Sequence, residues 1–483
     1  MEWSGQRSLH FLLLLVMKAP LDSLSTFNQF IENRYPGLED TKELDTLRAS
    51  DYCRLDEQKH TYLDFTGGNL YGTSQIEQHH QLLKESILGN PHSLNPSSLR
   101  SSELVDQARK HLLEFFNATD DYFLIFTPNA SGALKIIGES YPFHRKSHFL
   151  LPFDNHNSVN GIREYAKHNG ASYSYSPLNY EDLRFNEEQL LQNLQGHQDK
   201  TNKLFAYPAQ SNVSGVQHSL KWVKIAQDYG WDVLLDASAF VPTNQLDLSN
   251  VKPEFVSMSF YKMFGYPTGM GGLLIRKDAF KKLTKPWFAG GTVTLASAMT
   301  DRFYLAEDHS KFEDGTINYL DIPALEIGIR HLENVGMDTI HRRVSILTKI
   351  LLEQLQAMKH PNGQPMIKLF GPTNTEARGG TIIFNFLTSE GETFPYLNVE
   401  KEANKRNISL RTGCFCNPGI DEINNHLETG ELENFFQSSE NTNLHDITQH
   451  LDTMRGAVRI SVGLITNIKD IYNLLTFVKD FSH

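Results

Sequence analysis

The chain has 483 residues, of which 40% are hydrophobic and 21% charged, and its formal net charge is -12. This composition is typical of a globular protein with a substantial core, and it excludes disordered and collagen-like classes. The acidic balance and the lack of any basic run argue against a nucleic-acid partner, because binding phosphates requires clustered Lys and Arg.

The chain has only three cysteines, Cys53, Cys414 and Cys416. They cannot form a disulfide framework and favour a reducing compartment, so a cytoplasmic protein is expected. No apolar run reaches the roughly 18 residues of a membrane span, so no membrane association is expected. The short apolar stretch 9–17 resembles a signal peptide, but no small-residue cleavage site follows it. Residues 1–17 are therefore interpreted as an optional N-terminal extension.

Between about residues 120 and 280, short apolar runs alternate with helical patterns such as 130–139 and 220–229. This alternation predicts an α/β fold in which a large domain, residues 18–320 with an N-terminal arm, contains a mainly parallel, doubly wound sheet. Ligands of such sheets bind where the strands end. The predicted strands are 122–126, 148–151, 203–207, 233–236, 255–260 and 272–276.

After residue 320 the pattern changes. An amphipathic helix is predicted at 339–358 and strands at 381–386, 408–411 and 458–462, which indicates a smaller α+β C-terminal domain over residues 321–483. The polar stretch 421–446 is rich in Glu, Asn and Ser, and is predicted to be a surface insertion or a partly mobile loop.

Lys262 stands between an apolar strand and a glycine-rich loop. Burial at a strand end would remove solvation from its ammonium group, which lowers the pKa of a lysine and favours amine chemistry such as Schiff-base formation. Spacing alone leaves open both a cofactor lysine and a solvated loop lysine.

Asp236 ends the apolar run 233–236 and precedes Lys262 by 26 residues, so both side chains could emerge at one edge of the sheet. Pyridoxal phosphate acts as an electron sink only while its ring nitrogen is protonated, and a paired aspartate keeps it protonated. The more common role of a single aspartate is to cap a helix or form a turn. The pair of Lys262 and Asp236 nevertheless favours a pyridoxal phosphate site.

The segment 126–133 leads from a strand through small residues into a helix, whose N-terminal N–H groups could hold the cofactor phosphate. The chain contains neither GxxxxGK[ST] nor GxGxxG, so this loop is a weak signal by itself. His156 follows the strand 148–151, and its ring could stack on a flat cofactor. A lone histidine is more often a hydrogen-bonded surface residue.

Cys414 and Cys416 form a close pair within the loop 411–419. A structural zinc site needs four ligands and Cys53 lies far away, so no metal is expected. A loop cysteine between glycine and arginine suits a nucleophile, because positive surroundings lower a thiol pKa from about 8.5. Arg459 could clamp a substrate carboxylate, or form an ordinary surface ion pair.

Together these segments resemble enzymes of the class V aminotransferase fold, which is the pyridoxal-phosphate-dependent transferase fold type I. They are most similar to the aminotransferase-like half of molybdenum cofactor sulfurases. The resemblance begins at about residue 20. Its most specific parts are Ser-Phe-Tyr-Lys at 259–262, Phe-Gly-Tyr-Pro-Thr-Gly at 264–269 and Arg-Thr-Gly-Cys-Phe-Cys-Asn-Pro-Gly at 411–419.

The resemblance implies roles for the matched residues. Lys262 would bind the cofactor covalently, Asp236 would hold its ring nitrogen, and His156 would stack on its ring and contribute to catalysis. Asn212 would contact cofactor and substrate, Arg459 would hold the substrate, and Cys416 rather than Cys414 would accept sulfur. The phosphate would be held by Ala130, Ser131, Ser259 and Tyr261 and by Thr316 of the partner subunit, which implies a homodimer.

The implied activity is that of a cysteine desulfurase, which converts L-cysteine to alanine and leaves a persulfide on Cys416. Two departures from the pattern are Ala239, where related desulfurases commonly have glutamine, and the end of the chain at residue 483, which leaves no room for a molybdenum-cofactor-binding domain. The sulfur acceptor therefore stays open and could be a separate molybdenum-cofactor-binding protein. Alternatives are a C–S lyase or aminotransferase acting on a specialised metabolite, and a non-catalytic binding protein that has kept the fold.

Overall fold

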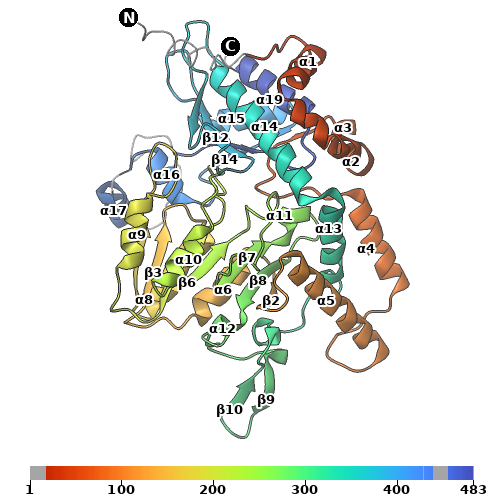
Figure 1. Cartoon of the computed structure of the whole chain (residues 1–483), viewed down its shortest axis with the longest axis vertical. Helices are drawn as coiled ribbons and strands as arrows, with labels where there is room; N and C mark the ends of the chain where they lie inside the picture. Colours follow the sequence, from red (N-terminus) through yellow and green to blue (C-terminus); the bar gives the residue numbers. More distant parts are fainter. Residues whose placement is uncertain (1–17, 428, 439–454, 482–483) are drawn as a thin grey trace, which may run out of the picture.

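A computed structural model describes residues 18–427, 429–438 and 455–481, so the predicted extension 1–17 lies outside the described residues. Its largest sheet has seven strands in the order β2-β8-β7-β6-β5-β3-β4 (Figure 1). The strands are β2 Tyr122–Thr127, β3 His148–Pro152, β4 Ser172–Ser176, β5 Lys203–Pro208, β6 Asp232–Asp236, β7 Phe255–Ser259 and β8 Gly271–Arg276.

The sheet is mainly parallel, as predicted for an α/β fold. Strands β4, β3, β5, β6 and β7 pair in parallel, whereas β8 runs antiparallel to β7 and β2. The carboxyl ends of β2, β3, β5, β6 and β7 consequently meet at one edge of the sheet. This edge is where a doubly wound sheet binds its ligands.

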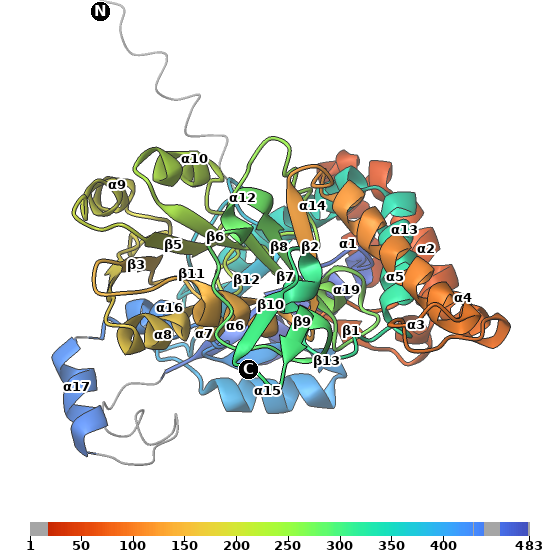
Figure 2. The same ribbon diagram turned by 90° about the horizontal axis from the view of Figure 1, so that it is seen from below.

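Helices cover both faces of this sheet (Figure 2). Side chains alternate along each strand, so Phe205 and Tyr207 of β5 join one hydrophobic cluster while Leu204 and Ala206 join the other. Both sets are buried, because each face is covered by helices. The covering helices are α6 Ala130–Ser140 and α8 Ile162–His168 on one face, and α9 Glu187–Gln195 and α10 Lys221–Asp228 on the other.

A second sheet has four antiparallel strands in the order β11-β12-β15-β14. The predicted strand 408–411 is divided, because β13 pairs with β1 whereas β14 joins this second sheet. The elements here are β1 Thr61–Tyr62, β11 Ile367–Phe370, β12 Thr381–Phe386, β13 Ile408–Ser409, β14 Arg411–Gly413, β15 Ala457–Ser461, α1 Leu24–Arg34, α13 Ile322–Val335, α14 Met337–Ala357, α15 Tyr396–Lys405 and α19 Ile468–Phe481.

Residues 421–446 were predicted to be a surface insertion or a partly mobile loop, and the prediction of a loop is wrong for the first part of this stretch. Helix α16 Pro418–Asn424 begins behind the cap Asn417 with proline in its first turn, and α17 Thr429–Ser438 follows. Such a start favours a helix despite the polar composition. Residues 439–446 lie outside the described residues. The other elements are α2 Glu43–Asp51, α3 Arg54–Glu57, α4 Thr73–Glu85, α5 Pro96–Phe115, α7 Asn157–Asn160, α11 Phe260–Phe264, α12 Lys277–Phe280 and the hairpin β9 Val293–Ser297 and β10 Arg302–Leu305, with 3-10 turns at Pro36–Thr41, Gly290–Thr292 and His309–Phe312.

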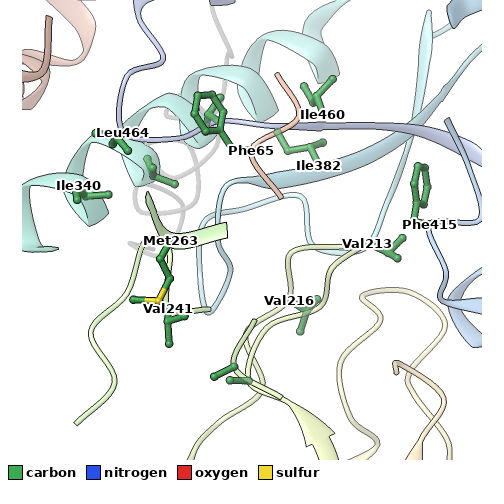
Figure 3. Close-up of a cluster of buried hydrophobic side chains, with 14 of the residues drawn as sticks. Phe65, Val213, Val216, Val241, Met263, Ile340, Ile382, Phe415, Ile460 and Leu464 are labelled. Carbon is green, nitrogen blue, oxygen red and sulfur yellow. The ribbon is translucent and has the colours of Figure 1, made fainter. Parts of the chain in front are cut away.

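A hydrophobic cluster joins the two sheets (Figure 3). Met263 of α11 and Val241 lie in segments that follow strands β7 and β6 of the large sheet. Ile382 of β12 and Ile460 of β15 lie in strands of the small sheet. This shared core fixes the position of the loops that run between the sheets. In the described part of the chain, no helix is long and apolar enough to cross a membrane.

Candidate active site

The strand ends of the large sheet surround a cavity of about 210 Å³. Most of the predicted site residues line this cavity, whereas Arg459, Cys416 and Thr316 are not among its lining residues. The lining side chains are Asn129, Ala130, Ser131, Leu134, His156, Ser158, Pro208, Gln210, Asn212, Asp236, Ser238, Ala239, Ser259, Tyr261 and Lys262.

Lys262 lies in the short helix α11, which begins directly after β7. Burial lowers the pKa of its amine, because the charged form loses water, while the neighbouring Asp236 carboxylate opposes this shift. A lowered pKa increases the fraction of neutral amine, which is the form that attacks an aldehyde. The structure therefore favours covalent amine chemistry at Lys262.

Asp236 ends β6 and uses only one of its two carboxylate oxygens within the protein. Its Oδ1 accepts hydrogen bonds from the backbone N–H of Ser238 at 3.1 Å and from the Ser238 hydroxyl at 2.6 Å, with Ser257 Oγ at 3.4 Å. Among the described residues, Oδ2 has no hydrogen-bonding partner. An acceptor left free at the cavity fits a ligand that carries an N–H group.

His156 caps helix α7, and its Nδ1 accepts a hydrogen bond from the backbone N–H of Ser158 at 3.1 Å. A nitrogen that accepts carries no proton, so the ring is neutral in this geometry. Burial, the largest influence, lowers the pKa of His156 and favours the same neutral form. A flat, uncharged ring at the cavity wall suits stacking on an aromatic ligand.

The N-terminus of α6 forms one wall of the cavity. Asn129 caps it by accepting from the N–H of Gly132 at 3.0 Å, and Ala130 N donates to Ser259 Oγ at 2.9 Å. A Cβ atom at Gly271 would lie 2.5 Å from the carbonyl carbon of Asn129, so the close approach of β8 to this turn requires glycine. The positive end of the helix dipole, with the hydroxyls of Ser131 and Ser259, makes an anion site.

Arg459 of β15 is buried and partly neutralised by a residue that the sequence analysis missed. Its Nη2 donates to Asp64 Oδ1 at 2.8 Å and its Nη1 donates to the carbonyl of Asn212 at 2.8 Å. Asp64 also accepts from Arg411 Nε at 2.9 Å. Burial lowers the pKa of Arg459, while Asp64 opposes the shift. In the described structure Arg459 Nε is buried without a hydrogen-bonding partner.

Cys416 is exposed, and its backbone lies against the cavity wall. Its carbonyl accepts from the N–H of Asn157 at 2.7 Å, and the preceding carbonyl, of Phe415, accepts from Asn212 Nδ2 at 2.8 Å. Cys414 is more buried, and burial together with the nearby Asp421 carboxylate raises the pKa of its thiol to about 12. Cys416 is therefore the more exposed of the two cysteines.

Thr316 is exposed and lies outside this cavity, with its hydroxyl 3.3 Å from Asn90 Nδ2. Gln210, which the sequence analysis missed, also lines the cavity, as does Ala239. No sequence signal distinguished Gln210 from the other polar residues that follow β5.

The family model for "Aminotransferase class-V" matches residues 61–474. The chain belongs to this family. A molybdenum cofactor sulfurase of Solanum lycopersicum is 37% identical over an alignment of 474 positions, which covers 91% of this chain and 57% of the relative. The human molybdenum cofactor sulfurase is 35% identical, over 90% of this chain and 51% of its own length. The chain thus spans little more than half the length of these relatives.

The fold is similar to solved cysteine desulfurase structures. The enzyme of Thermococcus onnurineus NA1 matches with a TM-score of 0.74 and 21% identity, covering 90% of this chain and 97% of that one. A cysteine desulfurase of Escherichia coli matches with a TM-score of 0.70 and 19% identity, covering 90% and 98%. These likenesses confirm the predicted transferase fold type I.

Proposed function

We propose that the chain is a pyridoxal-phosphate-dependent cysteine desulfurase, which converts L-cysteine to alanine and holds the removed sulfur as a persulfide on Cys416. One observation carries the proposal. Lys262, Asp236 and the N-terminus of α6 line one cavity, and the Cys416 loop packs against the wall of this cavity. The sulfurases and desulfurases named above support the same activity.

The residues at the cavity fit the cofactor. Lys262 would bind it covalently, and the free Oδ2 of Asp236 would hold its ring nitrogen. His156 offers a neutral ring for stacking, and Asn212 and Tyr261 also line the cavity. The phosphate would be held by Ala130, Ser131, Ser259 and Tyr261. When bound, pyridoxal phosphate supplies an electron sink for the bonds of the substrate amino acid.

The chain contributes proton transfer and orientation. The Lys262 amine would be the base that takes the proton from the substrate Cα, a role that its lowered pKa favours. Arg459 would bind the substrate carboxylate, and Asp64 and the Asn212 carbonyl hold its Nη2 and Nη1 in place. Orienting the substrate in this way lowers the entropic cost of the reaction.

Cys416 performs the sulfur transfer. Its thiolate attacks the substrate sulfur, the carbon–sulfur bond breaks, and the electron pair left on carbon takes up a proton, so that alanine leaves. The sulfur remains on Cys416 as a persulfide, with no external oxidant or reductant required. The exposure of Cys416 would allow an acceptor to reach this sulfur.

The pure protein loaded with pyridoxal phosphate should release alanine from L-cysteine, and should release an equal amount of sulfide when a reducing thiol is present. Amino-acid analysis and a sulfide assay measure the two products. A failure to form either product would contradict the proposal. Pyruvate and ammonia in place of alanine would indicate a C–S lyase instead.

We also propose that the chain forms a homodimer through the hairpin β9–β10 and the neighbouring residues, with Thr316 reaching the cavity of the partner subunit. The hairpin projects from the body of the molecule (Figure 1). Its apolar side chains are exposed, which is uncommon for a monomer and marks an interaction surface. They are Leu295, Met299, Phe303 and Tyr304 of the hairpin, together with Trp287 and Phe288 just before it, with exposed fractions from 40% to 97%.

Placing charges on this hairpin should separate the subunits. The double variant Leu295→Glu with Tyr304→Glu should sediment as a monomer at micromolar concentration, because burying unpaired carboxylates in an interface costs a large amount of free energy. The matched control is Leu397→Glu on α15, since Leu397 is as exposed as Leu295. The dimer proposal fails if the wild type sediments as a monomer, or if the double variant stays dimeric.

The acceptor of the sulfur is proposed to be a molybdenum-cofactor-binding protein or domain, because the relatives named above are sulfurases of that cofactor. The three free cysteines suit a reducing compartment, so we propose a cytoplasmic location.

A further inference from the structure

Asp154 is a fully buried carboxylate that takes no part in the mechanism above. It follows β3 and is 0% exposed. Its Oδ1 accepts from Ser211 Oγ at 2.9 Å and from Asn417 Nδ2 at 2.7 Å, and its Oδ2 lies 2.9 Å from His218 Nε2. A buried carboxylate is costly unless its oxygens are hydrogen-bonded. Here three separate segments of the chain supply the partners.

The orientation of His218 toward Asp154 is fixed by packing. The imidazole stacks on the ring of Phe185 with centroids 3.8 Å apart and an interplanar angle of 5°. His218 is also buried. Asp154 is therefore held firmly on the side of the large sheet, and this makes it a rigid point of attachment for the third segment.

That third segment is the cysteine loop. Asn417 directly follows Cys416, and its Nδ2 lies between Asp154 Oδ1 and Asn212 Oδ1, the latter at 3.1 Å. The two preceding carbonyls are bound by Asn212 Nδ2 and by the N–H of Asn157. Three consecutive residues of the loop are thus attached to segments that follow β3 and β5.

The loop backbone needs such support. Phe415 and Cys416 have φ values of 55° and 54°, so two successive residues other than glycine lie in the left-handed region. This conformation is unfavourable for side-chain-bearing residues and persists only where the surroundings hold it. The Phe415 ring adds a buried contact, because the Arg459 guanidinium carbon lies 5.0 Å from its centroid and Val213 lies nearby (Figure 3).

We infer that Asp154 is a positioning residue for Cys416. Through Asn417 it holds the cysteine loop in its left-handed conformation, so that the thiol is presented on a fixed loop at the wall of the cavity rather than on a swinging arm. The consequence for sulfur transfer rests on the proposed function. The anchoring of the loop does not, and it can be measured in the absence of any turnover.

The test is a charge swap across the anchoring contact. In Asn417→Asp, two carboxylates would face each other where a hydrogen bond now lies, and the loop should detach. In the double variant Asp154→Asn with Asn417→Asp, an amide again donates to a carboxylate, and the loop should return. Ser211→Ala is the matched control, because it removes a hydrogen bond to the same oxygen of Asp154 without touching the loop.

Hydrogen exchange of peptides covering 411–420 measures how firmly the loop backbone is held. It is recorded in protein to which no L-cysteine has been added. Exchange should quicken at least about tenfold in Asn417→Asp, return most of the way to the wild-type rate in the double variant, and stay unchanged in Ser211→Ala. Thermal unfolding checks that each variant is folded. Should Asn417→Asp not fold, Asn417→Ala should show the same faster exchange.

The inference would be overturned if the loop in Asn417→Asp or Asn417→Ala exchanged at the wild-type rate. It would also be overturned if the loop in the double variant exchanged as fast as in Asn417→Asp. With L-cysteine added, the single variant should form the Cys416 persulfide at least about tenfold more slowly, while the cofactor absorbance still responds to the amino acid. If the wild type forms no persulfide, the proposed function fails, and the exchange rates still decide whether Asp154 anchors the loop.

Discussion

Replacing Lys262 with alanine should lower alanine release from L-cysteine by at least about a thousandfold, because in the proposed mechanism the same amine attaches the cofactor and moves the Cα proton. The lowered pKa of Lys262 supports both tasks at neutral pH, since a larger fraction of the amine is unprotonated. Initial rates of alanine formation, measured with saturating pyridoxal phosphate, give the loss directly.

Lys203→Met is the matched control for this variant. Burial also lowers the pKa of Lys203, but this lysine opens β5 and therefore lies at the opposite end of the sheet, where its Nζ donates to the carbonyl of Tyr229 at 2.6 Å. Its replacement should leave the rate per folded molecule within about twofold of the wild type. Near wild-type turnover in Lys262→Ala would refute the assignment of this amine.

Cys416→Ala should abolish the persulfide and reduce alanine release at least about a hundredfold, while the cofactor absorbance still changes when L-cysteine binds. Cofactor attachment and substrate binding involve other side chains, so only the sulfur-accepting step is removed. Mass spectrometry of the intact protein detects the added sulfur, and rapid mixing records the change in absorbance.

Cys414→Ala should still form the persulfide and release alanine at the wild-type rate. The pKa of Cys414 is raised to about 12, so its thiol is almost entirely protonated near neutral pH, and a protonated thiol is a poor nucleophile. Iodoacetamide at pH 8 should accordingly label Cys416 well ahead of Cys414. Persulfide on Cys414, or unchanged alanine release in Cys416→Ala, would show that the two cysteines have been assigned wrongly and would favour a C–S lyase.

The strands of the large sheet could be predicted because burial on both faces leaves continuous apolar runs in the sequence. The run predicted at 203–207 is the observed β5, Lys203–Pro208. Several strands without two buried faces were not predicted. The edge strand β4 reads Ser-Tyr-Ser-Tyr-Ser, and the hairpin β9–β10 exposes most of its side chains, so neither has the continuous apolar run of a strand buried on both faces.

Several residues that line the cavity were also accessible from the sequence, because they stand at or just beyond the end of a predicted strand. Asp236 ends β6, and Lys262 and His156 follow β7 and β3, so these three residues lie at one edge of the sheet. The residues that support the site could not be found this way. Asp64 and Arg459 are 395 positions apart in the sequence, and Asp154 and Asn417 are 263 positions apart. Only the folded chain brings such distant residues into contact.

Borohydride reduction of the freshly loaded protein, followed by peptide mapping, measures the central claim that the Lys262 amine holds the cofactor. Reduction fixes a cofactor bound to an amine permanently. The pyridoxyl label should appear on the peptide that contains Lys262 in the wild type and should be missing from the Lys262→Ala protein. An unlabelled Lys262, or a label spread over surface lysines, would contradict the claim.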